Sequence, residues 1–422
     1  MSKTIIIIGA GLAGLSAALQ AAENGCNVKL VSSLPSERAQ SVMAEGGINA
    51  ALNTKDENDS PEEHFTDTIK AACGLADPNA VWGMTQAAPE LVHWLLKLGV
   101  KFNMSGYDDV DLRNFGGQKK KRTAFAQSDT GKQIMTAMID AVRRKEASGM
   151  VERFSHHSFL TLRLCGNICC GCVIRDEYSQ ETVELPGDAV IVATGGMHGL
   201  FGNTTGSLSN TGEVTAELFR LGVPLANGEM IQYHPTTVKC GGKRMLISEA
   251  ARGEGGRLFA MKDGKQWYFM EEKYPELGNL MPRDITAREI WKVSHESEVF
   301  LDMTEISEEI ISNKLSGLAD DCMTYLHKDI RKEPVSVLPG IHYFMGGILV
   351  DEQHRTPIQN LYAAGECCAQ YHGANRLGGN SLLGALYGGR VAAKSACEQA
   401  DVVDLSCATQ IDFPPASQIS EI

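Results

Sequence analysis

The chain has 422 residues and contains no apolar run that approaches the roughly 20 residues needed to cross a bilayer. It also lacks an excess of positive charge, because 39 Lys and Arg stand against 52 Asp and Glu, for a formal net charge of -13. Nucleic acid and anionic membrane surfaces require a basic face, so we expect neither as the main partner. We expect no secretory leader, because residues 1–4 lead directly into the first apolar strand. We therefore expect a protein of the reducing cytoplasm that is at most peripheral to a membrane, through a partner subunit.

Cysteine is not scarce, since twelve are present and four of them cluster in a short segment: Cys165, Cys169, Cys170 and Cys172. A Gly-Asn pair separates two apolar runs there, and this pattern predicts a hairpin with strands at 161–165 and 168–174. Neighbouring strand residues point to opposite faces, so Cys169 and Cys170 cannot easily share an ion. The spacing also lacks the paired C-x2-C form of zinc sites. We expect structural cysteines and no metal, with a metal site as the alternative.

A dinucleotide-binding signature opens the chain. The β-branched run Thr4–Ile8 precedes the sequence GAGLAG at 9–14, which is followed by a helical pattern to about 22 and a second strand at 27–31. Glycines in this arrangement permit a tight turn, close approach of a pyrophosphate and packing of the helix on the strand. The second strand ends in Val31-Ser32-Ser33 without the acidic residue that binds ribose in NAD sites. A flavin is therefore favoured over NAD.

The remaining pattern predicts an α/β protein with a Rossmann-like flavin domain of the two-dinucleotide-binding type and an inserted α+β capping domain. Helices are expected from Pro61 to about Gly99, broken at Pro78 and Pro89, with buried strands at 187–196 and 360–366 and a closing helix from Leu382 to about Ala400. Sequence of mixed character at 234–342 suggests the insertion. The predicted division is residues 1–233 and 343–403 for the flavin domain, 234–342 for the cap and 404–422 for a tail.

One loop near the C-terminus carries a guanidinium flanked by glycines, Arg376 in GANRLGGNSLL at 373–383. Such a group can fork onto a carboxylate while the same loop touches a cofactor. Together with this loop, further motifs extend over about residues 4–400: AEGGINAAL at 44–52, RTAFA at 122–126, QYHPT at 232–236, SEAARGEGG at 248–256, PRD at 282–284 and HYFMGGI at 342–348. On these motifs the chain resembles the flavoprotein subunit family of fumarate reductase and succinate dehydrogenase, which includes L-aspartate oxidase.

The resemblance implies reduction of fumarate to succinate, with a hydride from the flavin N5 and a proton from Arg283. It assigns Glu249 and Arg252 to a proton relay toward solvent. It places His234, Ser248, His342, Arg376 and Phe115 at the dicarboxylate. The FAD site is expected at Gly9, Gly11, Ala13, Gly14, Ser32, Ala44, Gly46, Gly47, Ala193, Thr194, Gly195, Glu366, Ser381 and Leu382. Two cations and two imidazoles suit the two carboxylates of such a substrate.

Two departures from the family pattern refine the expectation. Membrane-bound members carry a flavin-linking histidine where this chain has Gln40, so we expect non-covalent FAD and a preference for fumarate reduction, as in anaerobic respiration. The chain also stops after the closing helix of the flavin domain, so the C-terminal helical domain of the family is expected to be absent. An iron–sulfur or other electron-transfer subunit is the expected partner.

The alternatives are L-aspartate oxidase, a reductase of another α,β-unsaturated carboxylate, and a non-enzymatic flavin module. The oxidase carries a glutamate where this chain has Phe115, and histidines where it has Gln118-Lys119-Lys120-Lys121. Phe115 offers no anion to a substrate ammonium group. A non-enzymatic module would not explain why Arg283 and all of the expected substrate-binding residues are present.

Overall fold

The computed structural model describes residues 2–106 and 108–401; the predicted tail at 404–422 lies outside them. A parallel five-stranded sheet forms the base of the molecule, in the order β20 (Leu361–Ala363), β10 (Ala189–Val192), β1 (Thr4–Ile8), β2 (Asn27–Ser32) and β6 (Val151–Ser155). The strands predicted at both ends of the chain thus meet in one sheet. The α/β fold and its Rossmann-like first unit are confirmed.

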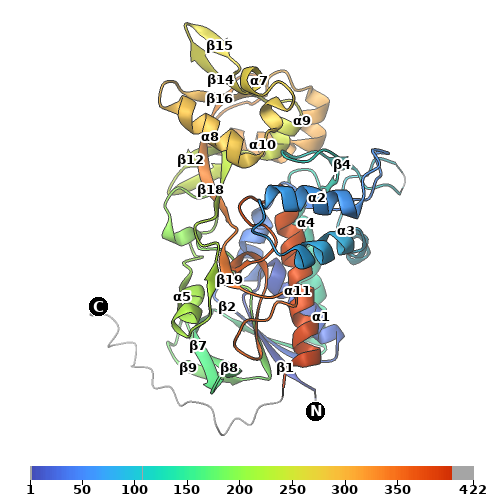
Figure 1. Ribbon diagram of the computed structural model, residues 1–422, viewed down its shortest axis with the longest axis vertical. Helices are drawn as coiled ribbons and strands as arrows, with labels where there is room; N and C mark the ends of the chain where they lie inside the picture. Colours follow the sequence, from blue (N-terminus) through green and yellow to red (C-terminus); the bar gives the residue numbers. More distant parts are fainter. Residues whose placement is uncertain (1, 107, 402–422) are drawn as a thin grey trace, which may run out of the picture.

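Both faces of this sheet are covered, which explains the continuous isoleucine run of β1. Ile5 and Ile7 pack in one core with α1 (Leu12–Glu23), α4 (Thr130–Ala147) and α11 (Asn380–Gln399). Ile6 and Ile8 pack in another core against the antiparallel sheet of β7 (His157–Cys165), β8 (Ile168–Asp176) and β9 (Thr182–Pro186). Figure 1 shows α1 and α11 side by side, and β7 to β9 at the opposite end from the upper part of the molecule.

The predicted cysteine hairpin is confirmed, because Cys165 pairs with Ile168 across Gly166 and Asn167. A bulge at Cys170 interrupts its register, a feature that simple alternation does not reveal. Cys169 and Cys172 are buried in the core between the two sheets, and burial raises the pKa of the Cys169 thiol to about 12. Within residues 2–106 and 108–401 no three His, Cys, Asp or Glu side chains gather as a metal site would require.

The helical segment at 61–99 consists of α2 (Pro61–Ala71) and α3 (Pro78–Leu98). Pro78 begins α3 behind the cap Asp77, whose side chain accepts from the backbone of Asn79 and Ala80. The break predicted at Pro89 was wrong, because α3 continues through it. Its buried face packs in the main core, which offsets the roughly 3 kcal/mol that an internal proline costs a helix.

A second lobe stands above the flavin-domain sheet (Figure 1). We call residues 241–337 the upper lobe; it contains β13 (Lys243–Leu246), α6 (Glu249–Gly253), β14 (Arg257–Lys262), β15 (Lys265–Trp267), α7 (Phe269–Lys273), α8 (Arg283–Ser294), β16 (Val299–Asp302), α9 (Glu308–Lys314), α10 (Ser316–Asp321) and β17 (Val335–Ser336). Its core runs from Ile247 to Val337 and includes Phe115 from the preceding part of the chain. This separate core supports the predicted insertion, and its capping role stays a prediction.

Two antiparallel strands, β12 (Ile231–Cys240) and β18 (Leu338–Phe344), connect the upper lobe to the rest. The predicted boundaries at 234 and 342 fall inside this pair, so the strands themselves form the joint.

Short elements complete the described chain: β3 (Ile48–Asn49), β4 (Leu112–Arg113), β5 (Thr123–Ala124), α5 (Glu213–Arg220), β11 (Leu225–Ala226), β19 (Gly347–Leu349), β21 (Cys368–Ala369), five 3-10 turns at 36–38, 40–43, 198–200, 278–280 and 365–367, and a π-helical turn at 322–326. Among the residues described, no helix combines the length and apolar character needed to cross a membrane.

Candidate active site

A cavity of about 620 Å³ extends from the first βα turn to the upper lobe. Thirteen of the fourteen residues expected at FAD line it: Gly9, Gly11, Ala13, Ser32, Ala44, Gly46, Gly47, Ala193, Thr194, Gly195, Glu366, Ser381 and Leu382. The exception is Gly14, where an added Cβ would lie 1.8 Å from the Gly9 carbonyl oxygen. Gly14 therefore allows the helix to approach the strand.

The nucleotide end of the cavity fits a dinucleotide. Gly9 has φ of 111°, and a Cβ there would lie 2.2 Å from the Ala193 carbonyl oxygen, so the turn requires glycine. The N-terminus of α1 opens onto the cavity with no acidic residue in its first turn, as a phosphate needs. The buried Ser32 hydroxyl at the end of β2 has no partner among the described residues, and it is placed for a ribose hydroxyl. The residues present thus fit FAD.

At the other end of the cavity, two histidines face each other from the strands that join the lobes. His234 lies on β12 and His342 on β18, with ring centroids 5.0 Å apart. Thr205 Oγ1 lies 2.8 Å from His342 Nδ1, and His234 Nδ1 lies 3.0 Å from the Thr236 carbonyl oxygen. Burial, with Arg283 and other cations nearby, holds the pKa of both histidines well below the usual value. Both rings are therefore neutral near pH 7 and can interact through hydrogen bonds but not through charge.

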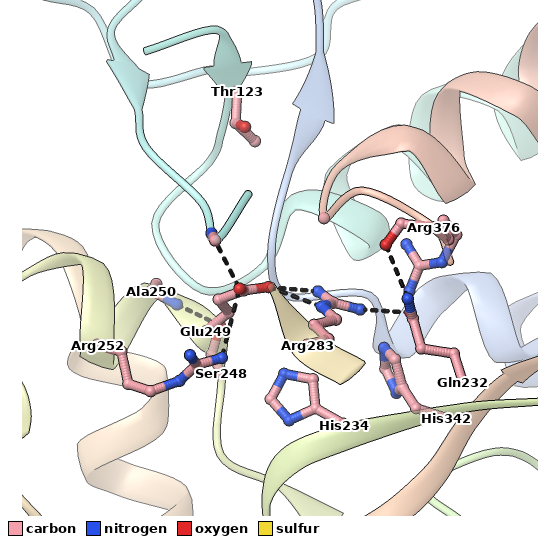
Figure 2. A network of polar contacts seen from close by, with 12 residues as sticks. Thr123, Gln232, His234, Ser248, Glu249, Ala250, Arg252, Arg283, His342 and Arg376 are labelled. Atoms are coloured by element: carbon pink, nitrogen blue, oxygen red, sulfur yellow. Dashed lines mark hydrogen bonds and ion pairs between the residues drawn. The ribbon is translucent and has the colours of Figure 1, made fainter. Parts of the chain in front are cut away.

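Arg376 lies beside these histidines, on the loop that enters α11 (Figure 2). Its guanidinium carbon is 4.4 Å from the centre of the Tyr343 ring. Burial lowers the pKa of Arg376 to about 9, and Arg283 contributes to the decrease. The side chain remains charged at neutral pH, yet no carboxylate among the described residues pairs with it. An anionic ligand would satisfy that charge.

Arg283 is the first residue of α8 and is paired with Glu249 of α6. Its Nε and Nη2 donate to Glu249 Oε2 at 2.8 and 2.6 Å, and its Nη1 donates to Gln232 Oε1 at 3.0 Å. Glu249 Oε1 accepts from the backbone N–H of Gly116 at 3.0 Å and lies 3.3 Å from Arg252 Nη2. Burial disfavours the Glu249 anion, but Arg283 and Arg252 outweigh it and lower the pKa of this carboxyl. Figure 2 shows the resulting row of alternating charges.

Arg252 does not reach solvent in this structure. Its side chain is 0% exposed, and its Nη1 donates to the Asn279 carbonyl oxygen at 2.7 Å. The turn at 278–280 covers it, and Asn279 in turn donates from Nδ2 to Glu271 at 3.1 Å. The expected relay from Arg252 to solvent therefore has no open end at Arg252 in this structure.

The other two expected substrate residues also line the cavity. Ser248 precedes α6 and caps it, because its side chain accepts from the backbone N–H of Ala250. Phe115 is buried against Gly46 and belongs to the core of the upper lobe. Sequence reasoning assigned no role to Gln232, Thr205 or Gly116, whose contacts hold Arg283, His342 and Glu249. Gln232 stands in the recognised QYHPT motif, so that motif was a signal for it.

Known proteins resemble this chain over most of its length. The model of the FAD binding domain family matches residues 4–382. The chain is 44% identical over 413 residues to the succinate dehydrogenase flavoprotein subunit of Bacillus subtilis, covering 96% of this chain and 70% of that one. It is 34% identical to the 8-methylmenaquinol:fumarate reductase flavoprotein subunit of Wolinella succinogenes (97% and 68% covered) and 34% identical to the L-aspartate oxidase of Streptomyces coelicolor (93% and 68% covered).

Among solved structures, quinol fumarate reductase of E. coli superimposes with a TM-score of 0.89 at 30% identity, covering 100% of this chain and 73% of that chain. The chain thus belongs to the FAD-binding oxidoreductase family that comprises the flavoprotein subunits of succinate dehydrogenase and fumarate reductase.

Proposed function

We propose that this protein reduces fumarate to succinate with FAD as its cofactor. The observation that carries the proposal is the convergence of two guanidinium groups and two neutral imidazoles on one end of the cofactor cavity. Although the whole molecule is acidic, this end of its cavity is locally cationic. A small dianion with a planar unsaturated bond matches both the charge and the set of hydrogen-bond donors.

Substrate binding follows from the different surroundings of the two arginines. Arg376, which has no carboxylate partner among the described residues, takes one substrate carboxylate in a forked pair. His234 and His342 hold the other end through hydrogen bonds without adding charge. Binding both ends fixes the double bond relative to the cofactor, which is the entropic part of catalysis.

FAD, when bound, would supply the hydride, and this chain's own residues supply the proton. Arg283 gives a proton from its guanidinium to one substrate carbon while the neighbouring carbon receives the hydride, so that fumarate becomes succinate. A guanidinium is a weak acid in water. After Arg283 has lost its proton, the ionised Glu249 takes a proton through Arg252 and passes it to Arg283, whose Nη2 lies 2.6 Å from Glu249 Oε2. Arg252 stabilises the Glu249 carboxylate in between.

We further propose that FAD is bound without a covalent link. Gln40 lines the cavity where membrane-bound members carry the linking histidine, and an amide cannot form that bond. A non-covalent flavin favours fumarate reduction over succinate oxidation. The direction is a proposal, because the names of the relatives include both succinate dehydrogenase and fumarate reductase. Electrons would come from an electron-transfer partner subunit, through which the protein would lie at a membrane surface.

L-aspartate oxidase is the second candidate, since one relative carries that name. Against it stands Phe115, which is 1% exposed at the cavity wall and offers no anion to a substrate ammonium group. A reductase of a different α,β-unsaturated carboxylate is the third candidate, because the Arg376 end of the site would suit any carboxylate.

Anaerobic re-oxidation separates these candidates. The protein is loaded with FAD, reduced with dithionite to its end point, and mixed with fumarate, urocanate, acrylate or iminoaspartate, while the return of flavin absorbance is followed. We expect fumarate to re-oxidise the flavin fastest. Preferential re-oxidation by another enoate would replace the substrate, and oxygen consumption with aspartate as sole reductant would favour the oxidase.

A further inference from the structure

Four polar side chains form a closed ring beside the proposed proton donor. Arg283 Nη1 donates to Gln232 Oε1 at 3.0 Å, and Gln232 Nε2 donates to Asn375 Oδ1 at 2.8 Å. Asn375 Nδ2 then donates to Asp284 Oδ1 at 3.0 Å, and Asp284 follows Arg283 in the chain. Two of the members, Arg283 and Asp284, begin α8 of the upper lobe, whereas Gln232 lies on β12 and Asn375 on the loop of Arg376.

The two charged side chains, Arg283 and Asp284, fix the direction of every hydrogen bond in this ring. A guanidinium can only donate, so the oxygen of the Gln232 amide must face Arg283 and its nitrogen must face Asn375. A carboxylate can only accept, so the nitrogen of the Asn375 amide must face Asp284. Each amide therefore has one orientation that satisfies both neighbours. The ring therefore couples the position of α8 to the position of the loop after Gly373.

The ring is also bonded to the backbone of Arg376, the residue proposed to bind a substrate carboxylate. Gln232 Nε2 donates to the carbonyl oxygen of Arg376 itself, at 2.7 Å. Gln232 is 3% exposed, and Figure 2 shows it between Arg283 and Arg376. Asn375 is only half-buried and Asp284 is exposed, so that the outer link lies at the rim where the upper lobe meets the Arg376 loop. Movement of α8 away from that loop would break the outer link first.

We propose that Asn375 is a positioning residue: through Gln232 and Asp284 it locks the proton donor Arg283 to the loop of Arg376 when the upper lobe covers the substrate. This inference rests on the proposed function for the identity of the donor. It goes beyond that function because neither Asn375 nor Asp284 touches the reacting atoms. Their contribution is to make the donor and the substrate grip move as one unit.

Substitutions at the outer link give a distinctive pattern. Asp284→Asn keeps an oxygen acceptor opposite Asn375, so this variant stays close to the unsubstituted protein. Asn375→Asp places two carboxylates against each other and breaks the link. The double variant N375D/D284N restores it with reversed polarity, because the new amide at 284 donates to the new carboxylate at 375, which still accepts from Gln232. Only a direct contact between these two residues predicts this rescue.

The test compares the unsubstituted protein, D284N, N375D, the double variant and the control N313D, all loaded with FAD. Asn313 is exposed on α9 of the upper lobe, so its change adds the same charge without touching the ring. With fumarate as substrate we expect kcat of N375D to fall about 10- to 100-fold, as for a misplaced catalytic group. Its solvent isotope effect on kcat should rise, because proton delivery becomes slower, and the double variant should recover both.

Amide hydrogen exchange of residues 283–294 in α8 is measured on the same five proteins, and it requires no substrate. We expect faster exchange in N375D alone. If the unsubstituted protein does not turn over fumarate, the proposed function fails while the exchange pattern still decides the inference. Equal behaviour of N375D and N313D, or a double variant as impaired as N375D, would overturn it.

Discussion

At the scale of single residues, the two arginines of the site differ in what already neutralises them. Arg283 is bonded to Glu249 through two nitrogens, whereas the contact given to the Arg376 guanidinium by residues 2–106 and 108–401 is with the face of the Tyr343 ring. The same side-chain type can therefore serve as proton donor in one place and as anion receptor in the other. Resemblance alone assigned these roles, and the contacts now give a physical reason for the assignment.

Arg283→Lys tests the donor role. Lysine keeps the charge but cannot bond Glu249 and Gln232 together with a planar fork. We expect kcat for fumarate reduction to fall by about 10²–10⁴, the contribution of a positioned proton donor, with a smaller change in KM because Arg376 and the histidines remain. Stopped-flow re-oxidation of the reduced flavin measures the step directly. Unchanged turnover would assign proton delivery to another residue.

Glutamine at position 40 predicts that the FAD can be released from the protein. Because its amide cannot bond to the flavin, acid precipitation of the yellow protein should release all of the FAD into the supernatant, where absorbance quantifies it. The pellet, run on a denaturing gel, should show no flavin fluorescence. Fluorescence that stays with the chain would mean that another side chain forms the link.

At the scale of helices and strands, sequence patterns predicted those elements whose conformation depends mainly on residues close by in the chain. The strands around the GAGLAG turn, the Gly166-Asn167 hairpin and the final helix needed only periodicity and turn residues. The failure at Pro89 arose because tertiary packing of α3 outweighs a local preference. The ring at Asn375 could not be predicted for a different reason. Gln232 and Asn375 are 143 residues apart, and the local sequence around either residue does not indicate a contact with the other. The burial of Arg252 depends likewise on the turn at 278–280, which the pattern of α6 does not contain.

The crossing of α1 and α11 yields an element-scale prediction. A Cβ at Gly389 of α11 would lie 2.3 Å from the Ala13 carbonyl oxygen, and Ala13 lines the cofactor cavity. Gly389→Ala should therefore separate the helices, lowering the free energy of unfolding by about 1–3 kcal/mol, the usual cost of overpacking. It should also weaken FAD binding, measured by fluorescence titration of the apoprotein.

Gly384→Ala, in the same helix, is the matched control. Its added Cβ would meet only side-chain atoms, the nearest at 3.3 Å, while the intrinsic gain in helix propensity is the same. A Gly384→Ala protein that loses as much FAD affinity as Gly389→Ala would show that the close helix crossing is not the cause.

At the scale of the whole molecule, burial has removed several histidines from their usual titration range. His64, His234, His354 and His372 are all at most 4% exposed. Burial lowers the pKa of His64 to about 3 and of His354 to about 4, and it holds those of His234 and His372 well below the usual value. These residues are distributed over α2, β12, the turn before β20 and the Arg376 loop, so their protonation would disturb the joint between the lobes as well as the flavin domain.

This distribution predicts loss of stability on acidification. Below about pH 6.5 the unfolded chain protonates these histidines while the folded protein does not, so the unfolded state binds more protons and stability falls as pH falls, by up to about 1.4 kcal/mol per pH unit for each histidine until its folded pKa is reached. Glu45 acts in the opposite sense, because burial and Asp321 raise its pKa to about 8 and the folded state holds its proton. These four histidines, together with His342, whose pKa burial also holds well below the usual value, should outweigh it, so the urea midpoint of the FAD-loaded protein should be lower at pH 5.5 than at pH 7.5. His64→Asn, which removes one of the four, should make the decrease shallower; a midpoint that rises on acidification would mean that buried carboxyls such as Glu45 dominate the pH dependence.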